Sequence, residues 1–77
     1  MNKERRNRLG DVIDKLEELQ AEVASIAEEE REAYDNMPEG LQESEKGQQI
    51  SENADDLDSI DSDFESLLDT LRELSER

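Results

Sequence analysis

The sequence predicts an all-α protein, an antiparallel two-helix coiled-coil hairpin that dimerises into a four-helix bundle. Apolar residues recur at steps of three and four in both halves of the chain, and the only proline lies between the halves. The β-branched and aromatic enrichment that is typical of strands is missing. With 77 residues and 31% hydrophobic composition, we expect one helical-hairpin domain over residues 1–77.

The first expected helix covers about residues 3–35. Its apolar residues alternate at steps of three and four, as in a heptad seam: Leu9, Val12, Leu16, Leu19, Val23 and Ile26. Glu30 occupies the next seam position and interrupts the pattern. Gly10 costs about 1 kcal/mol relative to alanine and marks a weak point behind the basic first turn.

The turn is expected over residues 36–43. Pro38 cannot continue a helical hydrogen-bond ladder, and it disfavours the α conformation at the preceding Met37. The first helix must therefore end here. Four residues in or next to this segment either close the end of the hairpin or contact a partner: Tyr34, Met37, Pro38 and Leu41.

The second expected helix covers about residues 44–75. Ser44 is a suitable N-cap, with Gly47 at the third helical position in place of the acidic residue of a full capping box. The seam continues with the same spacing at Ile50, Asn53, Leu57, Ile60, Phe64, Leu67, Leu71 and Leu74.

Folding the chain back at the turn predicts which residues face each other. A constant sum of position numbers places Glu30 opposite Leu57 and Val23 opposite Phe64, with Tyr34 opposite Asn53; a shift of one turn stays open. The polar seam residues Glu30 and Asn53 are expected to select the register. The predicted hairpin and dimer core comprises Leu16, Leu19, Val23, Ile26, Leu57, Ile60, Phe64, Leu67, Leu68 and Leu71.

Two helices alone leave one side of each seam in water, so we expect a homodimer. The residues beside the main seam are predicted to meet the second hairpin: Ile13, Ala27, Ala54 and Leu68. Repulsion between the negative charges opposes this association. The dimer should therefore become more stable as salt is added.

The charge of the chain is strongly negative and uneven. Lys and Arg number 9 and Asp and Glu 24, which gives a net charge of −15. Residues 1–10 carry +3, residues 11–69 carry −18 and residues 70–77 are neutral. Two such hairpins side by side would approach the linear charge density of duplex DNA, which suggests a nucleic-acid mimic. The alternative is a solvated face that keeps a small helical protein soluble. The candidate partner-binding carboxylates are Glu28, Glu29, Glu32, Asp55, Asp58 and Asp61.

The composition excludes most catalytic chemistry. Without Cys or His the chain has no thiol nucleophile, no imidazole base and no zinc-type cluster, so we expect no enzyme, no catalytic residue and no cofactor. The Asp-rich tract 55–65 lacks the glycine and the loop of a calcium site, so no metal site is expected. No signal peptide or membrane span is present, so a cytoplasmic location is expected. Direct binding to nucleic acid is unfavourable for so acidic a chain.

The central segment resembles a group of small, acidic, uncharacterised helical proteins of bacteriophages and bacterial mobile elements. The residues that carry the resemblance are Glu-Ala-Tyr-Asp-Asn-Met-Pro-Glu at 32–39, followed by Leu-Gln at 41–42 and Ser-Glu at 44–45. The resemblance covers about a quarter of the chain and implies a viral or mobile-element origin, where small acidic proteins often bind and disable a host protein in the bacterial cytoplasm.

These observations predict a non-enzymatic acidic protein-binding module. Its most concrete form is a phage-type inhibitor that mimics nucleic acid and blocks a basic host nucleic-acid-binding or defence protein. The alternative is an oligomerisation or scaffolding coiled coil whose partner contacts the apolar seam or the turn.

Overall fold

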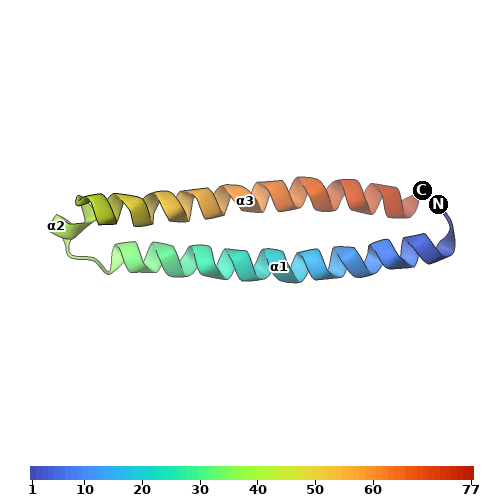
Figure 1. Cartoon of the computed structure of the whole chain (residues 1–77), viewed down its shortest axis with the longest axis horizontal. Coiled ribbons are helices and arrows are strands. Elements are labelled where there is room, and N and C mark those ends of the chain that lie inside the picture. Colours follow the sequence, from blue (N-terminus) through green and yellow to red (C-terminus); the bar gives the residue numbers. More distant parts are fainter.

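The computed structural model describes all 77 residues and consists of three helices without strands. Helix α1 covers Lys3–Asp35, α2 covers Glu39–Gln42 and α3 covers Glu45–Glu76. The two long helices lie side by side along their length, α2 joins them at one end, and both termini lie together at the other end (Figure 1). The molecule is a rod of 58 × 15 × 12 Å. The predicted all-α class, with a long helix pair packing together, is confirmed.

Local capping interactions define the bounds of α1. The side chain of Asn2 accepts a hydrogen bond from the backbone N–H of Arg5 at 2.8 Å, which satisfies one of the unpaired donors of the first turn. At the other end the N–H of Asn36 still donates to the carbonyl of Glu32 at 2.9 Å, and Pro38 stops the ladder. The helix continues through Gly10 without a break.

The turn is built on a close approach between α2 and the start of α3. Ser44 caps α3, as predicted, because its hydroxyl accepts a hydrogen bond from the N–H of Gly47 at 3.2 Å and also donates to the carbonyl of Leu41. A β-carbon at position 47 would lie 2.5 Å from the carbonyl oxygen of Leu41, and closer still to that of Gln42. The backbone of α2 therefore requires glycine at position 47.

The residues buried between the two long helices differ from the main predicted seam. The buried hydrophobic residues are Ile13, Ala27, Ala54 and Leu68. The expectation that these four would meet a second hairpin is wrong, because they already form the core of one chain. The physical reason is size: alanine at positions 27 and 54 permits a close approach of the two backbones, and the larger Ile13 and Leu68 fill the space between the helices nearer the termini.

The predicted core residues divide into two groups. Leu68 is fully buried, and five residues are half-buried between the helices: Leu16, Val23, Leu57, Phe64 and Leu71. Four other predicted core residues are exposed in the single chain: Leu19, Ile26, Ile60 and Leu67. A helix that is apolar at three of its seven heptad positions has two overlapping seams, and one neighbouring helix can cover only one of them.

The contacts between the long helices lie on both sides of the predicted register. Glu30 and Leu57, which were expected opposite each other, line the same hollow. The amide of Asn53, which was expected opposite Tyr34, instead donates a hydrogen bond to the carboxylate of Glu30 at 3.3 Å, about one helical turn from that pairing. The two polar seam residues thus satisfy part of each other's hydrogen-bonding capacity in a partly buried layer.

Candidate interaction surfaces

One side of the helix pair carries contacts between charged and polar side chains of α1 and α3, and we call it the polar face. Near the turn, the guanidinium of Arg31 contacts Asp55 at 3.4 Å and also pairs with Asp58. The hydrogen bond to Asp58, and next the negative charge of that residue, raise the pKa of Arg31 above its ordinary value. These side chains are about half exposed or more, so water and salt screen the pairs and they orient the helices more than they stabilise them.

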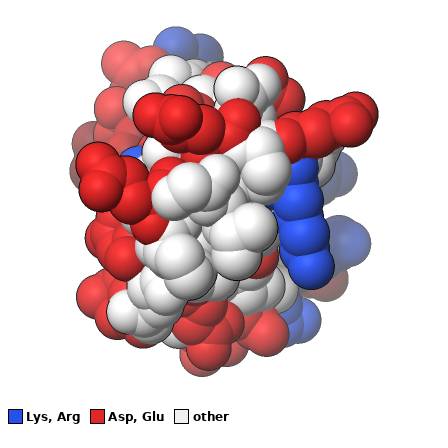
Figure 2. All heavy atoms as spheres, turned by 90° about the vertical axis from the view of Figure 1, so that its left-hand side faces the viewer, with Lys and Arg blue, Asp and Glu red and all other residues white.

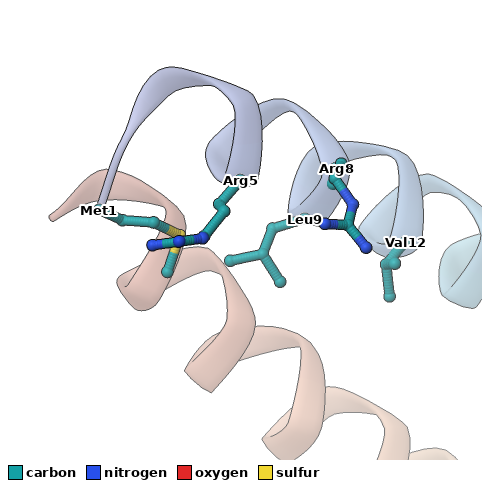
Figure 3. A pocket seen from close by; sticks show the side chains of 5 residues that line it. All are labelled: Met1, Arg5, Arg8, Leu9 and Val12. Atoms are coloured by element: carbon teal, nitrogen blue, oxygen red, sulfur yellow. The ribbon is translucent and has the colours of Figure 1, made fainter.

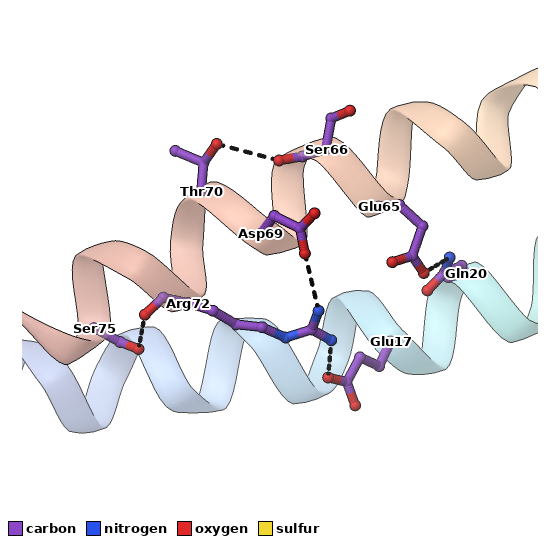
Figure 4. A network of polar contacts seen from close by, with 8 residues as sticks. All are labelled: Glu17, Gln20, Glu65, Ser66, Asp69, Thr70, Arg72 and Ser75. Carbon is purple, nitrogen blue, oxygen red and sulfur yellow. Dashed lines mark hydrogen bonds and ion pairs between the residues drawn. The ribbon is translucent and has the colours of Figure 1, made fainter.

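The polar face continues towards the termini (Figure 4). Arg72 of α3 contacts Glu17 of α1 at 2.8 Å and Asp69 on its own helix at 3.4 Å. The hydrogen bond to Glu17 is the main cause that raises the pKa of Arg72. Between these sites the amide of Gln20 donates to Glu65 at 2.7 Å and to Asp61 at 3.0 Å. The contacts therefore follow this face along much of the rod.

The structure divides the six predicted partner-binding carboxylates. Asp55, Asp58 and Asp61 are exposed, but they contact Arg31 or Gln20 across the helix pair. The other three are exposed on α1 and make no ion pair: Glu28, Glu29 and Glu32. Helical spacing places Glu28 on the side of Arg31, three residues later, and Glu29 on the side of Ile26, three residues earlier. The six residues do not form one patch.

Sequence reasoning missed the cross-helix partners Gln20, Arg31 and Arg72. The signal that reveals them is positional. Glu17 and Arg31 share one heptad position of α1, and Asp58, Glu65 and Arg72 share the equivalent position of α3. Opposite charges at equivalent flanking positions indicate which sides of two helices meet.

The opposite side of the rod carries an exposed line of large hydrophobic residues, which we call the apolar stripe. Its members and their exposed fractions are Val12 43%, Leu19 51%, Ile26 44%, Ile60 38% and Leu67 48%. Ile26 and Ile60 line one shallow hollow together with Leu57, and Ile60 and Leu67 line the next with Phe64. The stripe therefore crosses from one helix to the other as a continuous surface.

A further hollow extends the apolar stripe to the N-terminal end. It is lined by Met1, Arg5, Arg8, Leu9 and Val12, all from the start of the chain (Figure 3). In Figure 3 the guanidinium of Arg8 lies between the side chains of Leu9 and Val12, and that of Arg5 lies on the side of Met1. Part of the basic arm thus borders the apolar stripe.

The four predicted turn residues are divided between structural and exposed positions. Tyr34 and Met37 are half-buried, and the carbonyl of Tyr34 accepts a hydrogen bond from the amide of Gln42 at 2.9 Å. Pro38 and Leu41 are exposed, Leu41 to 52%. Figure 2 views this end of the rod and shows uncharged side chains at its centre, with acidic ones around most of the edge and basic ones on the right. Tyr34 and Met37 close the end, and Pro38 and Leu41 are open to contact.

The acidic side chains form no metal-binding constellation. No group of three or more of them lies close enough to hold a metal ion. Neither long helix contains an apolar stretch sufficient to cross a membrane. Comparison of this chain with known protein families, with characterised proteins and with solved structures gives no match.

Proposed function

We propose that the chain is a non-enzymatic acidic protein-binding module, an antiparallel coiled-coil hairpin that pairs with a second copy in a four-helix bundle. In this form it occupies the basic surface of a nucleic-acid-binding protein. Linear charge density supports the proposal. A net charge of −15 over 58 Å is one charge per about 3.9 Å, and two chains side by side reach one per about 1.9 Å, against about 1.7 Å for duplex DNA.

The carboxylates are available for such binding. Every Asp and Glu of the chain is exposed except Glu30, which is half-buried. A protein that binds nucleic acid carries Lys and Arg side chains along its groove to neutralise phosphates, and a rigid rod of carboxylates can replace those phosphates. The resemblance of residues 32–45 to phage and mobile-element proteins favours a host defence nuclease as the target class.

Capture from a bacterial lysate tests this function. We expect nucleic-acid-binding proteins to be retained at low salt, and to be released by high salt or by added duplex DNA, because DNA competes for the same basic groove. Reversing the charge of Glu28, Glu32 and Glu52 on the outer sides of the rod should weaken retention. The matched control reverses Glu4, Glu73 and Glu76 near the free ends. Retention that neither DNA nor the outer reversals weaken would contradict the proposal.

The exposed apolar stripe favours a second function, that of a scaffolding coiled coil. In that case the partner contacts apolar side chains of the stripe, or Leu41 at the turn, and binding gains little from charge. A partner protein should then stay bound to the chain in 1 M salt. Leu41→Ser should abolish this binding, whereas the outer charge reversals should leave it unchanged.

A further inference from the structure

We propose that a second copy of this chain covers the apolar stripe, with the twofold axis crossing the rod at Leu19 and Leu67 and the two turns at opposite ends. Each α1 then lies on the α1 of the partner subunit, and each α3 on its α3. The inference rests on the dimer proposed above and assigns its face and its register.

The area of the stripe side fits a stable dimer. The chain exposes 5794 Å², more than the about 4,800 Å² expected for a compact monomer of its 8.9 kDa. The long sides of the rod measure 58 × 12 Å and 58 × 15 Å, or about 700 and 870 Å², and a standard interface buries about 800 Å² on each subunit. One second copy on the stripe side therefore offers an interface of standard size.

The spacing of the apolar residues suits a twofold axis at Leu19. Val12 precedes Leu19 by seven residues and Ile26 follows it by seven, so each Val12 meets the partner's Ile26. On α3 the same relation holds around Leu67, with Ile60 seven residues before it and Leu74 seven after it. Apolar side chains thus meet apolar side chains in the central layers of the contact, within seven residues of the axis on each helix.

The charges beside the stripe select the same register. Arg8, Lys15, Glu22 and Glu29 are exposed and recur every seven residues, each three or four residues from a stripe residue of α1. A twofold axis at Leu19 places Lys15 against the partner's Glu22 and Arg8 against the partner's Glu29. By symmetry each pairing occurs twice in the dimer, and all of these contacts join opposite charges.

The alternative arrangement, with both turns at the same end, joins like charges. It places α1 on the partner's α3 at equal heights along the rod. Asp56 lines the same hollow as Ile26, and Gln20 contacts Asp61 and Glu65, so Glu29 would face Asp56 and Glu22 would face Asp63. Opposed carboxylates destabilise such an interface, so the antiparallel arrangement is favoured.

A disulfide-trapping experiment tests the face. The chain contains no cysteine, so a single introduced thiol reports only on its own position. Leu19→Cys should form an intermolecular disulfide within minutes of mild oxidation, because the twofold axis brings the two copies of this residue together. The control is Ala24→Cys, exposed on the polar-face side of the same helix. If Ala24→Cys is trapped as fast as Leu19→Cys, the assigned face is wrong.

A charge exchange tests the register. Lys15→Glu should weaken dimerisation roughly tenfold, and Glu22→Lys should do the same, because each converts two attractive contacts into repulsive ones. The double variant should recover to within about threefold of the original, with sedimentation equilibrium as the measurement and circular dichroism as the check on helicity. A double variant weaker than either single variant overturns the register. An original chain that stays monomeric at millimolar concentration overturns the dimer in both proposals. A failed charge exchange with salt-sensitive lysate capture intact overturns the register alone.

Discussion

The amide of Asn53 donates a hydrogen bond to the carboxylate of Glu30 at 3.3 Å across the helix pair, in a partly buried position. Gln49 completes the group by donating to the side-chain oxygen of Asn53 at 3.0 Å. One polar pair in an apolar seam costs stability but penalises every other alignment of the helices. The pair thus identifies one alignment among those that the heptad spacing permits.

Replacing this pair by leucine should separate stability from specificity. We expect the double variant Glu30→Leu, Asn53→Leu to raise the free energy of unfolding by about 1 kcal/mol or more, because two polar groups no longer lose their contact with water. The same variant should populate several assemblies in sedimentation velocity. Glu30→Leu alone should raise the free energy of unfolding by less, because it leaves the side-chain amide of Asn53 without its hydrogen-bond acceptor. A double variant that is less stable than the original would show that the hydrogen bond is net stabilising.

Leu67 and Leu68 are adjacent, yet their truncation should have different effects. Leu68 is 0% exposed, so Leu68→Ala should lower the free energy of unfolding by about 2–4 kcal/mol through the cavity that it leaves. Leu67 is 48% exposed, so Leu67→Ala should cost much less in urea unfolding at dilute, monomeric concentration. At high concentration Leu67→Ala should weaken dimerisation. If Leu67→Ala and Leu68→Ala lower the free energy of unfolding equally at dilute concentration, the predicted seam that contains Leu67 is part of the core after all.

Gly10 and Gly47 should respond differently to an added methyl group. Gly47→Ala should destabilise the chain by about 1–3 kcal/mol, because the added carbon meets the carbonyl oxygens of Leu41 and Gln42. At Gly10 a β-carbon has open space, so Gly10→Ala should stabilise α1 by about 1 kcal/mol. Thermal unfolding followed by circular dichroism measures both changes. A neutral Gly47→Ala would show that α2 moves aside at little cost.

Removing Arg31 should have a small effect that depends on salt. Arg31→Met should lower the urea midpoint slightly in dilute buffer and not at all in 1 M NaCl, because both ion pairs are exposed and screened. The raised pKa of Arg31 means that its carboxylate partners stabilise the charged form. That contribution is complete below the ordinary pKa of arginine and is lost only as the pH rises through the raised value. The difference in urea midpoint between Arg31→Met and the original chain should therefore show no change from arginine titration between pH 6 and 9.

Local sequence determined the helices and their ends. Asn2 and Ser44 cap the two long helices, Pro38 ends the first, and the spacing of apolar residues specifies helix over strand throughout. Each of these effects acts over fewer than about eight residues, so each can be recognised without knowing what lies opposite. The acidic character of the rod surface follows from composition in the same way.

Tertiary structure decided which of two overlapping seams is buried. Leu9, Leu16 and Val23 belong to both seams, so periodicity alone cannot choose between the layers of Leu19 and Ile26 and those of Ile13 and Ala27. The choice depends on both helices at once: the small side chains of Ala27 and Ala54 permit close approach, and the polar partners of Arg31 and Arg72 lie on the other helix. The most apolar seam consequently remains on the surface, because a single neighbouring helix covers only one side of each apolar face.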